Sequence, residues 1–355
     1  MEVVIIGGGP AGIITGLHLL EEGIEPLILE KKTRIESTAC AECCDFRSLK
    51  KIPFDSHPYI SKEVEGAKIF FPKDSCLSCY IKGVVLNRNE WLNGMANEFV
   101  KRGGKLMTNA RVSAINKKCV HLSNNEKIKY ERLIGADGPS SIVRKYMGIK
   151  QEVICGVQYK VKCNTSDMHY LQFYFNKEFS SHYSWVFPKK DCLNVGLAGK
   201  FSQLDFFLNA IGFEKKDVIK KEAGAIPISG IPSKIVEGNI ALIGDAASMT
   251  NPLSGGGLCP IIHAASILSE NIDDLKKYER EIKKHPMAHS SLLKAKNVLV
   301  SLANKELTTI GELLDGKILG NFSFSDFPSF LKHPFLLPKI LLLGRGANLA
   351  MKWGW

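Results

Sequence analysis

The first thirty residues constrain the fold of this chain more than any other segment. The apolar run Val3–Ile6 leads directly into Gly7–Gly12, which has the pattern G-x-G-x-x-G, and an apolar-periodic helix follows. In such a turn the first glycine permits a tight bend, the second lets the backbone approach a pyrophosphate, and the third lets helix and strand pack closely. A second strand, Pro26–Leu29, ends at an acidic residue that can bind a ribose. We therefore predict a dinucleotide-binding βαβ unit that uses Gly7, Gly9, Ala11, Gly12 and Glu30.

The rest of the chain predicts two units that are interleaved in sequence. A length of 355 residues exceeds one average domain. From Ile154 to Leu197 the pattern turns to period-2 alternation, which is typical of an antiparallel sheet. The buried strand Ile240–Ile243 then returns the chain to the first unit. We expect a discontinuous dinucleotide-binding domain at 1–150 and 235–285, an antiparallel-sheet substrate domain at 151–234, and a helical C-terminal region at 286–355.

Two later strands end in acidic residues and identify the dinucleotide. Leu133–Gly138 ends in Asp137-Gly138, and Ile240–Ala247 contains Gly244-Asp245 before a helix. Together with the first motif, the ordered trio resembles the three-part signature of the hydroxybenzoate-hydroxylase-like flavoproteins. The resemblance implies FAD as cofactor, with Asp245 on its ribityl chain. It also implies an α/β fold, in which a Rossmann-like FAD-binding domain of the glutathione-reductase type carries the inserted sheet.

The run Gly244–Leu258, with three consecutive glycines, is similar to the flavin-facing loop of the geranylgeranyl reductase family. Glycines there let backbone N–H groups lie close to the ring, where negative charge develops on reduction. The resemblance places Arg88 on the phosphates of FAD and Val112 near its adenine. The cofactor contacts that it implies in the later segments are Asp137, Gly244, Asp245, Pro252, Gly256, Gly257 and Leu258.

The segment Tyr183–Pro188 resembles the Y-x-W-x-F-P pattern of the archaeal digeranylgeranylglycerophospholipid reductases. On a strand, residues i and i+2 share a face, so Tyr183, Trp185 and Phe187 are expected to line one wall. An aromatic wall suits an apolar, flexible substrate, although any half-buried strand shows the same alternation. The family has a proline three residues before the tyrosine, where this chain has Ser180.

Cys40–Cys43 resembles the Cys-x-Glu-x segment that packs against the flavin in the same family. The resemblance places Cys40, Ala41 and Cys43 beside the cofactor. Cys40 is then a candidate catalytic residue together with Tyr183 and Trp185, since its thiol could gate access or donate a proton. In a competing interpretation, Cys40 and Cys43 join the second C-x-x-C pair, Cys76 and Cys79, to bind zinc or an iron-sulfur cluster.

These features favour an FAD-dependent oxidoreductase that acts on CH–CH groups. The expected reaction saturates C=C bonds of prenyl (geranylgeranyl) chains in archaeal membrane ether lipids, which places the enzyme in phospholipid biosynthesis. The alternatives are an FAD-dependent monooxygenase of an aromatic or apolar substrate and an electron-transfer flavoprotein with a cysteine-bound metal cluster. The chain has no second glycine-rich βαβ unit, so its electron donor can be ferredoxin, deazaflavin or transiently bound NAD(P)H.

The formal charge of +11 comes from scattered Lys and Arg residues, which does not favour nucleic acid as a partner. We expect a cytoplasmic protein, because the first strand begins at Val3 without a signal peptide, and we expect Cys155, Cys163 and Cys192 to be core thiols. The apolar C-terminal segment, which includes Pro334–Leu343, Trp353 and Trp355, is punctuated by basic residues. It suits peripheral contact with a membrane, or packing over the substrate domain.

Overall fold

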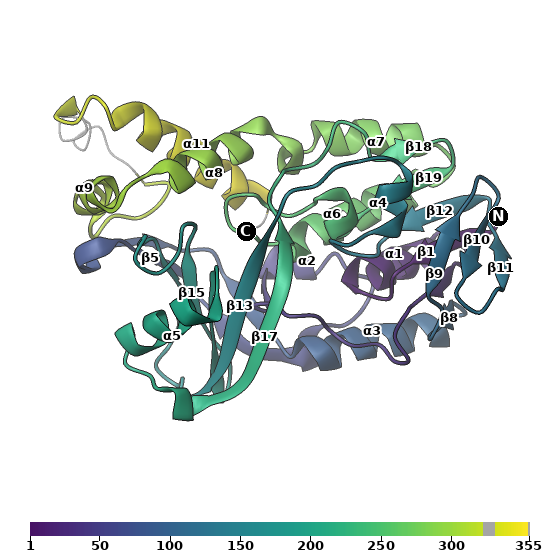
Figure 1. Cartoon of the computed structure of the whole chain (residues 1–355), viewed down its shortest axis with the longest axis horizontal. Coiled ribbons are helices and arrows are strands. Elements are labelled where there is room, and N and C mark those ends of the chain that lie inside the picture. Colours follow the sequence, from purple (N-terminus) through teal and green to yellow (C-terminus); the bar gives the residue numbers. More distant parts are fainter. Residues whose placement is uncertain (322–330, 354–355) are drawn as a thin grey trace.

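The computed structural model describes residues 1–321 and 331–353 (Figure 1). A six-stranded sheet has the order β18-β19-β12-β1-β2-β8, and its strands are parallel except for the hairpin of β18 and β19. The first and last segments of the dinucleotide-binding unit therefore pair side by side, as the sequence predicts. The strands are β1 (Val3–Ile6), β2 (Leu27–Leu29), β8 (Lys105–Met107), β12 (Arg132–Gly135), β18 (Val236–Glu237) and β19 (Ile240–Leu242).

Helices complete this α/β unit. Helix α1 (Pro10–Glu21) packs against both α3 (Arg88–Lys101) and α6 (Leu258–Ser269), while α4 (Ile142–Tyr146) follows β12. All four residues of β1 are buried, as expected of a parallel strand covered on both faces. Burial of this apolar run and of the facing side of α1 forms the main core, which fixes the glycine turn between them.

The second unit is a seven-stranded sheet of order β17-β13-β16-β15-β14-β5-β6. Its strands are antiparallel except for β14 and β5, which pair in parallel. Residues 66–79, which belong to the expected segment 1–150, contribute β5 and β6, the last two strands at one edge of this sheet. Helix α5 (Phe201–Ala210) packs on this sheet. The strands are β5 (Gly66–Phe70), β6 (Cys76–Cys79), β13 (Val153–Lys162), β14 (Tyr170–Tyr174), β15 (Ser184–Pro188), β16 (Cys192–Ala198) and β17 (Val218–Pro227).

Two three-stranded sheets flank the units. One has the order β3-β7-β4 and the other β11-β10-β9. Helix α2 (Phe46–Leu49) follows β3 directly, and Asp45 caps it by accepting from two backbone N–H groups. The strands are β3 (Cys43–Asp45), β4 (Ile60–Val64), β7 (Gly83–Leu86), β9 (Val112–Ile115), β10 (Cys119–Leu122) and β11 (Lys127–Lys129).

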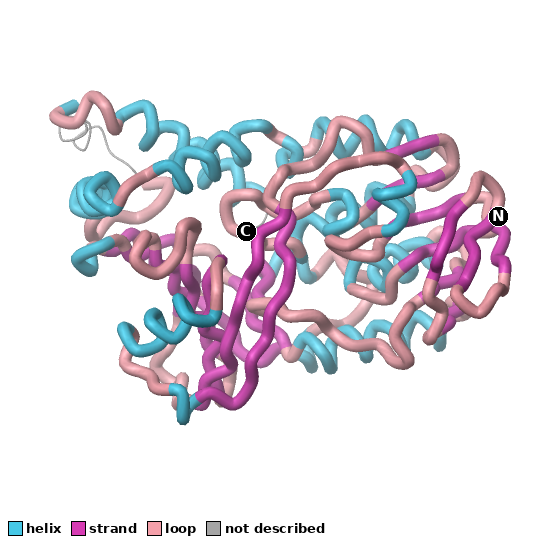
Figure 2. Tube along the Cα trace, in the orientation of Figure 1, coloured by secondary structure: helices cyan, strands magenta, loops and turns pink. Residues whose placement is uncertain are grey.

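The C-terminal region is helical where it is described, and it runs along one side of the molecule (Figures 1 and 2). After α7 (Leu275–Lys284), which lies in the expected segment 235–285, its elements are α8 (Ser290–Ser301), α9 (Asn304–Leu314) and α11 (Leu337–Trp353), and α11 packs against α8. The expected region 286–355 includes residues 322–330 and 354–355, among them Trp355, that lie outside the described residues. Within the described part, no helix is long and apolar enough to cross a bilayer.

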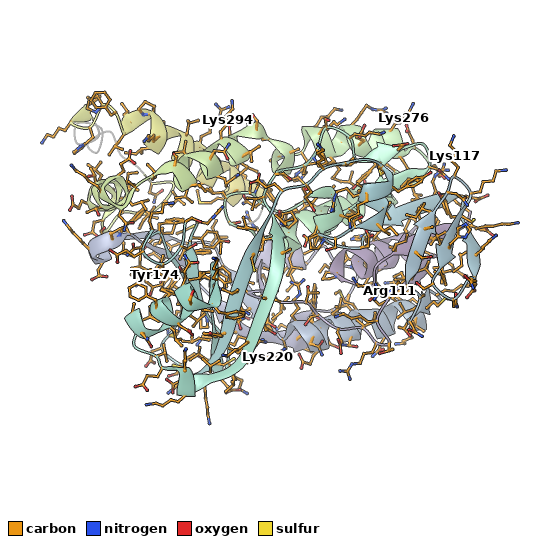
Figure 3. All side chains as sticks on the ribbon, viewed as in Figure 1. Arg111, Lys117, Tyr174, Lys220, Lys276 and Lys294 are labelled. Atoms are coloured by element: carbon orange, nitrogen blue, oxygen red, sulfur yellow. The ribbon has the colours of Figure 1, made fainter. Side chains whose placement is uncertain are left out.

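Charge and cysteine placement give one agreement and one correction. The labelled basic residues Lys294 and Lys220 lie at the top and the bottom of the view, in agreement with scattered charge (Figure 3). The expectation of core thiols in the seven-stranded sheet is wrong, because Cys155 is exposed while Cys163 and Cys192 are only half-buried. They lie near strand ends, where the faces of the sheet are less covered than at its centre.

Candidate active site

A cavity of about 640 Å³ lies between the glycine turn after β1 and the face of the seven-stranded sheet. Segments from both units line it. Three predicted residues, Gly12, Gly244 and Pro252, do not line it. The predicted residues that do are Gly7, Gly9, Ala11, Glu30, Cys40, Ala41, Cys43, Arg88, Val112, Asp137, Tyr183, Trp185, Asp245, Gly256, Gly257 and Leu258.

The glycine turn has the sterics that its pattern predicts. Gly7 has φ 110°, and a Cβ atom there would lie 2.4 Å from the Ala136 carbonyl oxygen. At Gly12 a Cβ atom would lie 1.9 Å from the Gly7 carbonyl oxygen, so this position packs helix against turn without facing the cavity. A Cβ atom at Gly9 would meet no other atom within 4 Å. Gly9 is also the N-cap of α1 and lacks a side-chain cap, which leaves helix N–H groups available to an anion.

Two predicted acids lie along the cavity beyond the turn. The Glu30 carboxylate accepts hydrogen bonds from the backbone N–H groups of Gly8 (2.7 Å) and Lys32 (2.9 Å), which fixes its direction. Asp137 accepts from the Ile142 N–H at 2.6 Å, but its Oδ1 atom is buried and has no partner in the described structure. Burial raises the pKa of Asp137, and hydrogen bonds from Ser141 and Ile142 oppose that rise. Its second oxygen is therefore available to a donor on a ligand.

Asp245 lies in a short 3-10 turn, Gly244–Ala247, that follows β19. Burial raises its pKa to about 6, against the opposing charges of Arg88 and Arg144. Gly244 has φ 64°, and a Cβ atom there would come within 2.7 Å of Ala11, so this glycine brings the turn against α1 without lining the cavity. Pro252 also stands away from the cavity, in the loop beside Gly230.

These features fit a bound FAD. Helix α6 also begins without a side-chain cap, at Gly257, and both Gly257 and Leu258 face the cavity. Two buried polar atoms at the cavity have no protein partner, namely Asp137 Oδ1 and Arg88 Nε. Buried polar atoms are costly to leave unpaired, so both are suited to bind polar groups of a ligand. Arg111, labelled in Figure 3, also lines the cavity next to Val112 and is a basic residue that sequence analysis missed.

Arg88 and Cys40 make a contact that the motifs did not predict. Arg88 opens α3, is buried, and donates from Nη1 to Cys40 Sγ at 2.9 Å. The Glu42 backbone N–H donates to the same sulfur at 3.2 Å. Two donors directed at one sulfur stabilise negative charge on it. At Cys43, burial raises the pKa of the thiol far above its usual range and keeps the thiol protonated.

The aromatic wall is present. Tyr183, Trp185, Phe187 and also Phe173 line the cavity, and neighbouring ring centroids lie 5.1 to 5.9 Å apart. The Tyr183 hydroxyl donates to the Ser254 carbonyl, and burial raises the pKa of Tyr183. This bond ties the wall to the glycine-rich loop.

Ser180 supports the turn that leads into the wall. Its buried hydroxyl donates to the Ala198 carbonyl at 2.6 Å and accepts from the His182 N–H at 3.1 Å. A serine hydroxyl in such a turn bonds to the nearby backbone, which is a different means of holding the chain from the fixed φ of a proline.

The two C-x-x-C pairs do not assemble. Cys76 and Cys79 lie three positions apart on β6, so their side chains point to opposite faces, and burial raises the pKa of Cys79 to about 11. Within 1–321 and 331–353, the ligand atoms of Cys40, Cys43, Cys76 and Cys79 form no cluster of three or more suited to one metal ion. The interpretation of a shared metal site is therefore wrong for these four cysteines.

A different group, Cys44, Asp45 and Cys259, does lie within 4.8 Å, and all three residues are buried. Hydrogen bonds account for it: the Cys259 thiol donates to Asp45 Oδ2 at 3.1 Å, and Cys44 Sγ lies 3.8 Å from Cys259 Sγ. That contact and burial raise the pKa of Cys44 well above its usual value. The group is a hydrogen-bonded part of the core in which Asp45 also caps α2.

Several cavity residues were missed. Alternation along β14 could have revealed Phe173, since it shares a face with other inward residues of that strand. Gln158 also lines the cavity and joins both units: its Oε1 accepts from Trp185 Nε1 and its Nε2 donates to the Cys40 carbonyl, each at 3.0 Å. Nothing in its sequence neighbourhood distinguishes Gln158 from any strand glutamine.

Fold and site together define an FAD-dependent oxidoreductase. Residues 1–52 match the family described as FAD binding domain. The chain is related to digeranylgeranylglycerophospholipid reductases: it is 29% identical to that of Methanococcus vannielii, over 88% of this chain and 90% of the relative. It is 26% identical to that of Methanosarcina acetivorans, over 88% of each chain.

Solved structures agree on the fold. A geranylgeranyl bacteriochlorophyll reductase-like protein from Thermoplasma acidophilum superimposes with a TM-score of 0.84 at 24% identity, covering 96% of this chain and 98% of that one. A probable FAD-dependent monooxygenase from Pseudomonas aeruginosa gives a TM-score of 0.68 at 15% identity, covering 88% of this chain and 99% of that one. The expected α/β flavoprotein fold with an added sheet is confirmed.

Proposed function

We propose that this protein is an FAD-dependent reductase that saturates C=C bonds of geranylgeranyl chains in archaeal membrane ether lipids. One observation carries the proposal: a single cavity joins the dinucleotide cradle at Gly9 and Asp245 to an aromatic wall at Tyr183 and Trp185. A cofactor in the cradle and an apolar chain on the wall would therefore meet in one space. The related digeranylgeranylglycerophospholipid reductases support the same class of substrate.

The proposed cofactor contacts are those of the sequence analysis. The α1 N-terminus at Gly9 would bind the pyrophosphate, Glu30 a ribose, and Asp245 the ribityl chain. When bound, reduced FAD supplies hydride to an acceptor carbon. We further propose the domain limits 1–150 with 235–285, 151–234 and 286–355, and residues 66–79 would then cross to the substrate sheet.

The chain's own side chains would prepare the alkene for reduction. The aromatic wall buries apolar surface of the prenyl chain, which is worth about 25 cal/mol per Å² removed from water, and holds the double bond in a dry cavity. Cys40 lies in the same cavity and would give its Sγ proton to one alkene carbon. Arg88 Nη1 and the Glu42 N–H, which already contact that sulfur, would stabilise the charge left on it.

We propose that the protein works in the cytoplasm at the membrane surface, where its lipid substrate lies. Support comes from the C-terminal region, where Leu331, Leu341 and Phe335 are exposed, Phe335 to 91%. Basic residues, among them Lys332 and Arg345, are interspersed with these apolar side chains. Exposed apolar side chains among cations favour contact with an anionic lipid surface. The electron donor is proposed to be ferredoxin, a deazaflavin or NAD(P)H.

The test is anaerobic incubation of the dithionite-reduced, FAD-loaded protein with unsaturated prenyl lipids, followed by mass spectrometry. Addition of two hydrogens per double bond is the expected result. Trp185→Leu serves as a matched variant, because it alters the wall and leaves the dinucleotide cradle intact. If no prenyl chain gains hydrogen, and an oxygenated product forms only after oxygen is admitted, the protein is a monooxygenase and the proposal is wrong.

A further inference from the structure

Glu42 lines the cavity, and its buried carboxylate is bound by three side chains from the other unit. Glu42 Oε2 accepts from Lys189 Nζ at 2.7 Å and from Asn194 Nδ2 at 2.9 Å, and Oε1 accepts from Lys160 Nζ at 3.2 Å. The side chains of Glu42 and Lys189 are only 7% and 8% exposed. We call these four residues the Glu42 clamp. It joins the loop that follows β2 to strands β13 and β16 and to the residue just after β15.

The clamp holds Glu42 in its charged form. Burial alone would raise the pKa of Glu42, but Lys189, Asn194 and Lys160 together outweigh burial and lower it. A buried charge pair is stabilised by further hydrogen bonds, and here Lys189 Nζ also donates to the Leu86 carbonyl at 2.8 Å, while the buried Asn194 Oδ1 has no partner in the described structure.

The backbone at Glu42 is in a conformation that favours glycine. Its φ is 69°, which is uncommon for a residue other than glycine and is sustained only by strong surrounding contacts. Those contacts are present: the Leu86 N–H donates to the Glu42 carbonyl at 2.9 Å, and Asn194 Nδ2 donates to the Ala41 carbonyl at 3.0 Å. In this conformation the Glu42 N–H points at Cys40 Sγ, 3.2 Å away.

A second link reaches the same cysteine from the aromatic wall. Gln158 Nε2 donates to the Cys40 carbonyl, and Gln158 Oε1 accepts from Trp185 Nε1. The backbone carbonyls of Cys40 and Ala41 are therefore held by side chains of the seven-stranded sheet, while Arg88 reaches the Cys40 sulfur from α3. The position of the thiol depends on how the two units are joined.

We propose that Glu42 is a positioning residue, which through Lys189 and Asn194 fixes Cys40 Sγ between the Arg88 guanidinium and the aromatic wall. The inference rests on the proposed function in one respect only, the role of the thiol in reduction. The positioning itself is a property of the folded chain. It predicts that Glu42 controls the reactivity of Cys40 without touching substrate.

The first test measures Cys40 reactivity directly. Wild-type holoenzyme and Glu42→Gln are treated with iodoacetamide at one fixed pH, and alkylation of Cys40 is followed by peptide mass spectrometry, with the exposed Cys155 as internal reference. We expect the Cys40 rate, relative to Cys155, to fall about tenfold, because the N–H donor to sulfur is no longer held in place. Glu65→Gln, at an exposed carboxylate that accepts from Tyr170, is the matched control and should leave it unchanged.

Two further variants separate positioning from folding. Glu42→Gly accepts φ 69° without strain but lacks the carboxylate, so a wild-type Cys40 rate in this variant would overturn the proposal. The double change Glu42→Gln with Lys189→Met removes both buried charges, which should raise the melting temperature above that of Glu42→Gln alone. Its Cys40 rate should remain low. Recovery of both stability and Cys40 reactivity would mean that the clamp is merely structural.

A kinetic arm connects the clamp to reduction. In the anaerobic prenyl assay, Glu42→Gln should lower kcat about tenfold with little change in KM, because the wall that binds the lipid is intact. A rise in KM with unchanged kcat would contradict positioning of the thiol. If the wild-type protein reduces no prenyl lipid, the proposed function fails, and the alkylation experiment still decides the role of Glu42.

Discussion

Replacing Asp245 with asparagine should change the stability of the FAD-free chain and its affinity for FAD in opposite directions. Burial raises the pKa of this carboxyl to about 6 from an ordinary value of 3.8, despite Arg88 and Arg144 nearby. A rise of about two pKa units corresponds to about 3 kcal/mol against the charged form. Because Asp245 lines the cavity and is partly exposed there, screening by solvent should reduce this cost to about 1–2 kcal/mol.

The sign of the pH dependence follows from the raised pKa. The folded chain binds the Asp245 proton more tightly than the unfolded chain, so the associated stability is fully present below about pH 4 and is lost as the pH rises through about 6. Asparagine carries no charge at any pH. The FAD-free variant should therefore match the wild type at pH 4 and exceed its free energy of unfolding by about 1–2 kcal/mol at pH 7.5.

FAD binding should respond in the other direction. A carboxylate accepts charge-assisted hydrogen bonds from ribityl hydroxyls, and an amide oxygen accepts weaker ones. Asp245→Asn should therefore raise the Kd for FAD about tenfold. Denaturant unfolding of the FAD-free protein at pH 4 and 7.5 measures the first effect, and titration of flavin fluorescence measures the second. Asp273→Asn, at an exposed aspartate, is the control. A variant that is no more stable than wild type at pH 7.5 would refute the burial argument.

Four further changes test other parts of the site. Gly12→Ala places a Cβ atom on the Gly7 carbonyl and should lower the free energy of unfolding by about 3 kcal/mol; denaturant unfolding measures this, and a loss below 1 kcal/mol would contradict the packing role. Cys40→Ser should lower kcat for prenyl reduction about 100-fold when the variant is saturated with FAD; an active variant would assign the proton to water. Trp185→Leu should raise KM for the prenyl lipid and cost about 2 kcal/mol of stability, and an unchanged KM would place the lipid elsewhere. Phe335→Ser should weaken partition onto anionic vesicles about tenfold in a sedimentation assay; equal partition would remove this residue from the membrane contact.

The two features to which we assign a role with lipid lie far apart in sequence. The wall begins at Tyr183, whereas the exposed apolar side chains of the C-terminal region include Phe335. Under the proposed function, the wall would supply a dry place for chemistry and the exposed C-terminal side chains would contact the bilayer.

Much of the flavin-binding unit could be predicted from the sequence because its signals are local. At Gly12 a Cβ atom would meet the Gly7 carbonyl oxygen, five residues earlier in the chain, and Gly7 itself has φ 110°, a conformation that favours glycine. Strand β19 and Asp245 were likewise predictable, because a buried run followed by Gly-Asp is contiguous. The same locality explains the wall, since alternate residues of one strand must share a face.

Tertiary structure alone decided how the cavity is closed and what controls its thiol. The Glu42 clamp joins residues 118 to 152 positions apart, and no periodicity encodes a hydrogen bond across that distance. The failure of Cys76 and Cys79 to meet Cys40 and Cys43 has the same origin, because spacing along a chain does not say which strands pair. Local sterics thus determined the dinucleotide cradle from the sequence, while burial of charges between two packed units, which depends on every neighbour in space, determined the surroundings of Cys40.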